Sequence, residues 1–220
     1  MSLWKAQFYA GMTLGIQGRK GVDTAATVER CHFTWDHQPR IFKRDFLVNK
    51  RGESIENKLR FKHLSEILGF PEGPVQSIGK TFNLFWLDEI QANPDAQGAM
   101  RSLGPALGLG KERGGSLWRV GTAGPGFWAD IAFKQRAERL PCKTKGIEEY
   151  YGPGESDGPR RLILQVHYSA DPEKDPDTEK GRKWKEQEQA YYLQVLGNSQ
   201  ADWDREYEIN FEGCAGDRFL

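Results

Sequence analysis

A run of four large apolar residues that ends in two adjacent carboxylates constrains the fold of this chain more than any other stretch. The run is Leu84 to Leu87, and Asp88 and Glu89 follow it directly. An apolar run without alternation is typical of a strand covered on both faces, as in a parallel α/β sheet. Ligands of such sheets bind outside the carboxyl ends of the strands, so the two acids are candidates for a site. A buried strand followed by an exposed acidic turn fits the hexapeptide equally well.

Alternating strand and helix patterns predict an α/β fold with a largely parallel sheet flanked by helices. The predicted strands are 12–17, 84–87, 116–120 and 161–168, with a pair of short strands at 58–62 and 66–70. The predicted helices run from 24 to Pro39, from Pro94 to Gly104-Pro105, from 127 to about 138, and from 178 to 196. Residues 142–159 are predicted to form a long surface excursion, that is, a loop on the surface, and residues 171–177 a polar connecting segment. We expect the strands that contain Met12, Leu84, Leu117 and Leu162 to lie in one sheet.

Composition excludes several classes of protein. The 220 residues carry 31 basic and 31 acidic side chains, and this zero net charge argues against holding nucleic acid by bulk electrostatics. The basic run from Arg40 to Arg51 is more typical of a solvated surface than of a DNA contact. The three cysteines form no Cys-x-x-Cys pair, so neither a disulfide framework nor a zinc site is indicated. No apolar run approaches the roughly 18 residues of a membrane span, and we expect a soluble cytoplasmic protein.

One stretch nearly matches a phosphate-binding loop. Gly73 to Thr81 contains Gly79-Lys80-Thr81, but five residues separate the two glycines where the loop has four. A phosphate loop follows a strand and opens a helix, so that backbone N–H groups converge on the phosphates. Here Lys80 and Thr81 directly precede the strand 84–87. The sequence therefore contains no recognisable phosphate loop.

Histidine and tryptophan add no separate site. The histidines show no metal-ligand spacing and are predicted to be polar surface or packing residues: His32, His37, His63 and His167. Six tryptophans are predicted to be core residues rather than base-stacking platforms: Trp35, Trp86, Trp118, Trp128, Trp184 and Trp203.

The order of these pieces resembles the ATPase domain of the large terminase subunit of tailed bacteriophages over most of the chain. The matching pieces are the strand that ends in a Walker B-type Asp88-Glu89, the helix of 93–103, and the strand 117–122, which ends at Thr122. The segment Thr122-Ala123-Gly124-Pro125 differs from the family's Thr-Ala-Asn-Pro only at Gly124. The tail 203–211 resembles the family's Trp-Arg-Arg-Glu-Tyr-x-x-x-Phe segment, which leads toward its nuclease domain.

This resemblance implies a P-loop-NTPase-like fold and gives roles to three residues. Asp88 is expected to hold Mg²⁺ and so to contact the bound ATP, Glu89 to orient the attacking water, and Thr122 to sense the γ-phosphate. The implied cofactors are ATP and Mg²⁺. The implied partners are double-stranded viral DNA, the phage portal and the small terminase subunit, in a homo-oligomer in the host cytoplasm.

The family's phosphate loop lies upstream of a strand like 12–17, and its nuclease begins where this sequence stops. We therefore expect residues 1–170 to be a partial ATPase domain that lacks the N-terminal phosphate-loop unit. Residues 171–220 are expected to be a helical linker toward an absent nuclease domain.

Three functions remain open from the sequence. The first is an ATP-hydrolysing DNA-packaging motor, and the second is a non-catalytic remnant or assembly module of the packaging complex. The third is a metal-dependent nuclease that would combine Asp88 and Glu89 with a distant acid such as Asp130 or Asp171.

Overall fold

The computed structural model describes residues 2–45, 57–73, 79–108, 114–124, 127–152 and 162–211, of which 133 and 134 are described without their side chains. The chain forms two compact units, Met1–Gly121 and Thr122–Leu220. The boundary expected at residue 170 does not coincide with this division. The assignment of 1–170 to a partial ATPase domain and of 171–220 to a linker stays a prediction.

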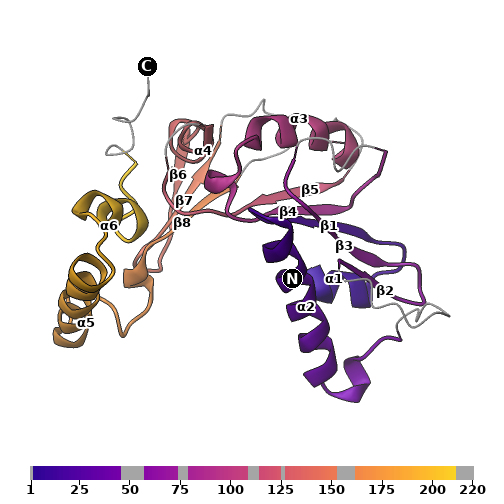
Figure 1. Cartoon of the computed structure of the whole chain (residues 1–220), viewed down its shortest axis with the longest axis horizontal. Helices are drawn as coiled ribbons and strands as arrows, with labels where there is room; N and C mark the ends of the chain where they lie inside the picture. Colours follow the sequence, from indigo (N-terminus) through magenta and orange to yellow (C-terminus); the bar gives the residue numbers. More distant parts are fainter. Residues whose placement is uncertain are drawn as a thin grey trace. The chain divides into compact units, whose positions relative to one another are not determined.

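The first unit is built on a five-stranded sheet with the strand order β2-β3-β1-β4-β5. Four strands are parallel, namely β1 (Thr13–Gln17), β3 (Glu66–Phe70), β4 (Leu84–Leu87) and β5 (Ser116–Arg119), and β2 (Lys58–Arg60) is antiparallel to β3. Helices α1 (Ser2–Phe8) and α2 (Gly21–His37) lie on one face, and α3 (Ala96–Leu107) lies on the other (Figure 1). The predicted fold class is therefore confirmed as mixed α/β with a mostly parallel sheet flanked by helices.

Alternation along the strands divides the core between the two faces. Toward α1 and α2, β1 and β4 contribute Leu14, Ile16 and Leu84 to a cluster whose other buried members are Leu3, Ala6, Val28, Leu59, Phe61 and Ile67. The opposite face carries three buried aromatic rings, Phe70, Phe82 and Phe85, with centroids 4.9–5.7 Å apart. Strand β4 is thus covered on both faces, as its unbroken apolar run predicted.

The helix after Glu89 begins two residues later than predicted, and Gly104-Pro105, predicted to end or kink it, does not end it. The helix α3 begins after Asp95, whose Oδ1 accepts a hydrogen bond of 3.0 Å from the N–H of Gly98. It then continues through Pro105 to Leu107, and Gly108 ends it in the left-handed conformation with φ 57°. Pro105 removes a helical hydrogen bond, but Leu107 is buried, and its packing keeps the last turn helical.

The second unit contains a separate three-stranded antiparallel sheet, β6-β7-β8, followed by helices. Its strands are β6 (Glu138–Leu140), β7 (Ile147–Tyr151) and β8 (Leu162–Val166). Its helices and turns are α4 (Phe127–Ala129), a π-turn at Asp130–Lys134, a 3₁₀ turn at Tyr168–Ala170, α5 (Glu179–Ala190), a π-segment at Tyr191–Val195 and α6 (Gln200–Glu206). The first unit also contains two 3₁₀ turns, Arg40–Phe42 and Ile90–Ala92. None of the helices in the described part of the chain is long and apolar enough to cross a membrane.

Three predictions for this unit are wrong. Leu162 does not join the parallel sheet, because β8 pairs antiparallel with β7, and its apolar side chains at 162, 164 and 166 are 54–58% exposed. The helix predicted to reach about residue 138 ends at 134, and the surface excursion 142–159 contains β7. In β7 the adjacent Glu148 and Glu149 interrupt the apolar pattern, so the local sequence does not show the strand.

Tryptophan burial follows the prediction only in part. Trp203 is 1% exposed, whereas Trp118 is 37% exposed and stacks on Trp86 of the neighbouring strand with a centroid distance of 5.9 Å. Because β5 is the last strand of the described sheet, its side chains receive cover from one neighbouring strand instead of two.

A single carboxylate joins the small sheet of the second unit to its C-terminal helices. Glu208 accepts hydrogen bonds from Lys185 (2.8 Å), Trp203 Nε1 (3.2 Å) and the hydroxyl of Tyr168 (3.2 Å), and its other oxygen lies 3.4 Å from His167 Nε2. Partial burial by itself raises the pKa of Glu208. The hydrogen bond and charge of Lys185, with the bonds from Trp203 and Tyr168, outweigh burial and hold that pKa below its ordinary value.

We expect a close-packing glycine of β1 to be intolerant of a side chain. A Cβ on Gly15 would overlap the ring of Phe85, which packs against Phe70 and Phe82, so Gly15→Ala should lower the free energy of unfolding by about 1–3 kcal/mol. Gly104 of α3 has open space at the same position, and Gly104→Ala should raise it by up to about 1 kcal/mol. Urea denaturation of both variants checks this, and equal stabilities would contradict the packing described.

We expect Glu208 to make the second unit sensitive to acid. Because its pKa is lower in the folded than in the unfolded state, its contribution is complete above the unfolded value of about 4.3 and is lost as pH falls through the folded value. Denaturation between pH 3 and pH 7 should show this loss in the wild type, and Glu208→Gln should remove it. Glu179→Gln is the matched control, since Glu179 is exposed and pairs with Lys183 four residues on, a contact between two solvent-exposed side chains. An unchanged pH profile in Glu208→Gln would contradict the role of this carboxylate.

Candidate site at the carboxyl edge of the parallel sheet

The winding of the sheet reverses between β1 and β4. From β1 the chain passes through α2 to β2 and β3 on one side, then crosses to β4 and continues through α3 to β5 on the other side. The helices that follow β1 and β4 accordingly lie on opposite faces (Figure 1). In open α/β sheets such a reversal leaves a crevice outside the carboxyl ends of the two strands, where ligands bind.

Asp88 and Glu89 directly follow β4, at the carboxyl end of the strand beside which the winding reverses. The N–H of Asp88 donates to the carbonyl of Gln17, the last residue of β1, over 2.9 Å, so Asp88 is fixed beside the end of β1. Asp88 is half-buried and Glu89 is exposed. Glu89 has φ 49°, a left-handed conformation that costs a residue with a side chain of order 1–3 kcal/mol. Strain of this kind is concentrated at functional sites, and here it turns the chain sharply at the end of β4.

The turn after β1 brings a cation to Glu89. Arg19 Nε lies 3.4 Å from Glu89 Oε2 and 3.4 Å from Asp23 Oδ2, and all three side chains are 38–49% exposed. Thr24 fixes this turn through two hydrogen bonds: its hydroxyl accepts from the N–H of Gly18 (2.8 Å) and donates to the carbonyl of Phe70 (3.0 Å). The sequence did not single out Arg19, because only the pairing of β1 with β4 brings it to a residue 70 positions away.

Strand β5 also ends at this edge of the sheet. The N–H of Ile90 donates to the carbonyl of Val120, and the N–H of Val120 donates to that of Leu87, so Val120 and Gly121 continue beside the two acids. A Cβ on Gly121 would meet Gln91 Oε1, the end of a flexible side chain that can move aside. Thr122 is exposed and is the first residue of the second unit. A site shared by Asp88 and Thr122 stays a prediction.

Lys80 and Thr81 lie at the opposite edge of the sheet. They precede β4, as predicted, and the N–H of Asn83 donates to the carbonyl of Thr13 at the start of β1. The four residues of β4 separate this end from Asp88 by about 13 Å. Residues 74–78 of the near-match to a phosphate loop lie outside the described residues. Lys80 and Thr81 therefore do not cradle a phosphate held at Asp88.

The carboxylates of Asp88 and Glu89 are oxygen donors, so a metal bound there would be a hard cation such as Mg²⁺. Among the described residues no group of three His, Cys, Asp or Glu side chains could hold a metal ion by itself. Mg²⁺ does not require such a group, because it is usually bound through one or two carboxylates and completes its shell with water and substrate phosphates. A half-buried Asp88 beside Glu89 is compatible with that mode of binding.

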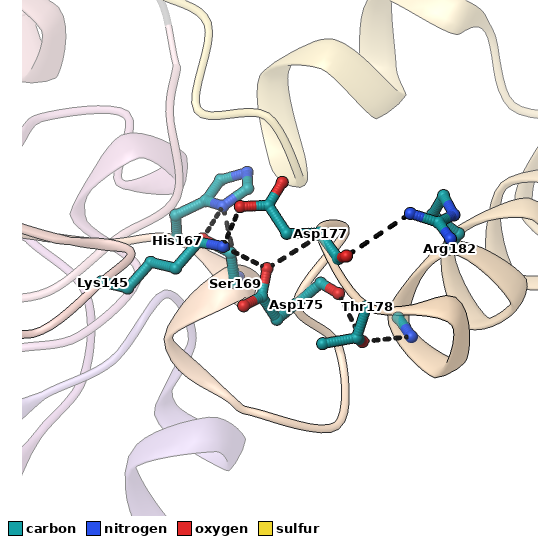
Figure 2. Close-up of polar contacts among 8 residues, drawn as sticks. Lys145, His167, Ser169, Asp175, Asp177, Thr178 and Arg182 are labelled. Atoms are coloured by element: carbon teal, nitrogen blue, oxygen red, sulfur yellow. Dashed lines mark hydrogen bonds and ion pairs between the residues drawn. The ribbon is translucent and has the colours of Figure 1, made fainter.

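A second concave region lies within the second unit and includes none of the predicted site residues. It is a hollow of about 490 Å³ lined by Arg139, Cys142, Lys143, Thr144, Lys145, Gly146, Ile147, Glu148, Gln165, His167 and Ser169. Its most strongly bound cation, Lys145, donates to Asp175 (2.5 Å) and Asp177 (Figure 2). These hydrogen bonds raise the pKa of Lys145 and lower that of Asp175.

The contacts around Lys145 are those of a structural connection. The hydroxyl of Thr178 donates to the carbonyl of Asp175 and accepts from the N–H of Gly181, so the segment that Lys145 holds is also the cap of α5 (Figure 2). Arg139 is similarly paired with Glu148 over 2.7 Å. Two cations of the hollow are thus matched by acids of the same unit. The edge of the sheet at Asp88 remains the candidate site because the winding of the parallel sheet reverses there.

Comparison with known proteins gives limited similarity. No protein-family model matches the chain, and no curated protein matches it. Solved structures of the large terminase from a thermophilic bacteriophage are similar: one in complex with ADP has 14% identity and a TM-score of 0.41, and one in another crystal form has 15% identity and a TM-score of 0.41. Each match covers 61% of this chain and 33% of the terminase, so the chain spans about a third of their length. A likeness at this TM-score assigns no family.

Proposed function

We propose that this chain is the nucleotide-hydrolysing portion of a viral DNA-packaging motor of the large-terminase type. The observation that carries the proposal is the position of Asp88 and Glu89 at the point where the winding of a parallel sheet reverses. The order of sequence elements that resembles the terminase ATPase supports the same reading. The substrate class is a nucleoside triphosphate, ATP by resemblance.

The chemistry follows from the two acids. Asp88, fixed to β1 through its backbone, would hold Mg²⁺, which neutralises charge on the phosphates when it is bound. Glu89 lies one residue further on and is exposed, so its carboxylate would orient a water molecule and accept its proton. Thr122, which follows β5, would report the state of the γ-phosphate to the second unit, of which it is the first residue.

The partners follow from the same proposal. They are double-stranded viral DNA, the portal and the small terminase subunit, and the working form is a homo-oligomer in the host cytoplasm. The near-zero net charge of the chain requires that any DNA contact be local.

A specific observation favours the non-catalytic assembly module as second candidate. Lys80 and Thr81 lie at the edge of the sheet opposite Asp88. The described residues of the first unit therefore place no Gly-Lys-Ser/Thr loop at the acids, and much of the energy that holds a triphosphate comes from such a loop. The nuclease has less support, because Asp130 and Asp171 belong to the second unit and no described trio of ligands exists.

We expect the chain by itself to bind ATP weakly and to hydrolyse it little, and a protein that joins it to a phosphate loop to do both. In that protein Glu89→Gln should retain binding and lower turnover by about a hundredfold or more, since a positioned base is lost. Asp88→Ala should weaken Mg²⁺-dependent binding. Calorimetric titration with ATP, with and without Mg²⁺, and phosphate release measure these effects.

The control is Glu29→Gln, which removes an exposed acid of α2 and should change neither quantity. Full turnover in Glu89→Gln would contradict the role of Glu89. Absence of Mg²⁺-dependent ATP binding from the joined protein would leave the assembly module as the function.

A further inference from the structure

The ion pair between Arg19 and Glu89 joins the two strand ends that border the crevice. Arg19 belongs to the turn after β1 and Glu89 to the end of β4, and the two strands are hydrogen-bonded neighbours. The contact uses Arg19 Nε at 3.4 Å, and the same atom lies 3.4 Å from Asp23. Arg19 therefore lies between two carboxylates without closing tightly on either of them.

This pair is easily exchanged. Arg19 is 47% exposed and Glu89 is 49% exposed, and ion pairs in such surroundings are screened by water. The contact with Glu89 uses one nitrogen, Nε, at 3.4 Å, whereas a phosphate can accept two parallel hydrogen bonds from the planar guanidinium. A phosphate bound beside Glu89 could therefore take Arg19 from this single long contact.

We propose that Arg19 is a positioning residue that pairs with Glu89 in the absence of nucleotide and with a phosphate group of the ligand in its presence. The inference rests on the proposed nucleotide site and adds its resting state. Transfer of Arg19 to the phosphate releases the carboxylate of Glu89 at the position where it is needed to orient water. The left-handed backbone of Glu89 keeps that carboxylate at the edge of the crevice after the pair opens.

Competition between Glu89 and a phosphate for Arg19 predicts opposite effects of the two substitutions on tripolyphosphate binding, which a purely structural ion pair does not predict. Arg19→Gln should weaken binding of tripolyphosphate, titrated without Mg²⁺, by about tenfold, as expected on loss of a bidentate arginine contact. Glu89→Gln should tighten it by about threefold, because Arg19 no longer has to leave a partner. Arg19→Lys should bind tripolyphosphate more tightly than Arg19→Gln and less tightly than the wild type, since lysine keeps the positive charge but lacks the paired N–H donors of the guanidinium.

Removal of any acid near the bound anion also strengthens anion binding through the change in net charge alone. The variant that combines Arg19→Gln with Glu89→Gln separates this general effect from the competition for Arg19. In the Arg19→Gln background the further change Glu89→Gln should tighten binding much less than in the wild type. Arg101→Gln is the matched control, because Arg101 is exposed on α3. Thermal melting of each variant confirms that folding is retained.

The two hypotheses fail in different ways. If the wild type and Glu89→Gln do not bind tripolyphosphate, or if Arg19→Gln binds it as the wild type does, the role of Arg19 is overturned whatever the result with ATP. Equal effects of Glu89→Gln with and without Arg19 overturn it as well. If Mg²⁺ and ATP together do not bind while tripolyphosphate binding depends on Arg19 as described, the proposed function fails and the phosphate contact of Arg19 stands.

Discussion

The parallel pairing of β1 with β4 is the contact on which the rest of the first unit depends. Its register runs from Leu14 opposite Leu84 to Gln17 opposite Leu87. This pairing fixes which side chains face α1 and α2 and which face α3, and it sets the end of β4 beside the turn after β1. A shift by one residue would move every apolar side chain of β4 to the other face. The core and the candidate site are therefore specified by the same register.

Packing is tight along that pairing. Gly15 lies opposite Phe85, whose ring occupies the space that a side chain at 15 would need, and Phe82 packs edge-on against the same ring. The ring of Phe85 thus fills the space that a Cβ on Gly15 would occupy. Arg19, Asp88 and Glu89, which lie beyond the carboxyl ends of these strands, are partly exposed and are not part of the core. The side chains that stabilise the sheet therefore lie within the strands, and the candidate site residues lie beyond the strand ends.

The second unit is held in another way. It places Leu162, Leu164 and Val166 on an exposed face and relies on polar connections, among them Glu208 with its donors and Lys145 with Asp175 and Asp177. Pairs as exposed as that of Lys145 contribute little to the free energy of unfolding. Glu208 is less exposed and contacts the buried Trp203, and its effect on stability should be larger.

The sequence by itself determined the features that depend on near neighbours. The apolar run of β4 and the periodic pattern of α2 indicated elements that the structure contains, and the order of strand and acids indicated the edge at which Asp88 and Glu89 lie. The tertiary structure alone decided that β8 joins a separate antiparallel sheet, that α3 continues past Pro105, and that Arg19 meets Glu89. Each of these outcomes depends on side chains or strands distant in the chain, and local periodicity carries no information about which distant partner a segment will find.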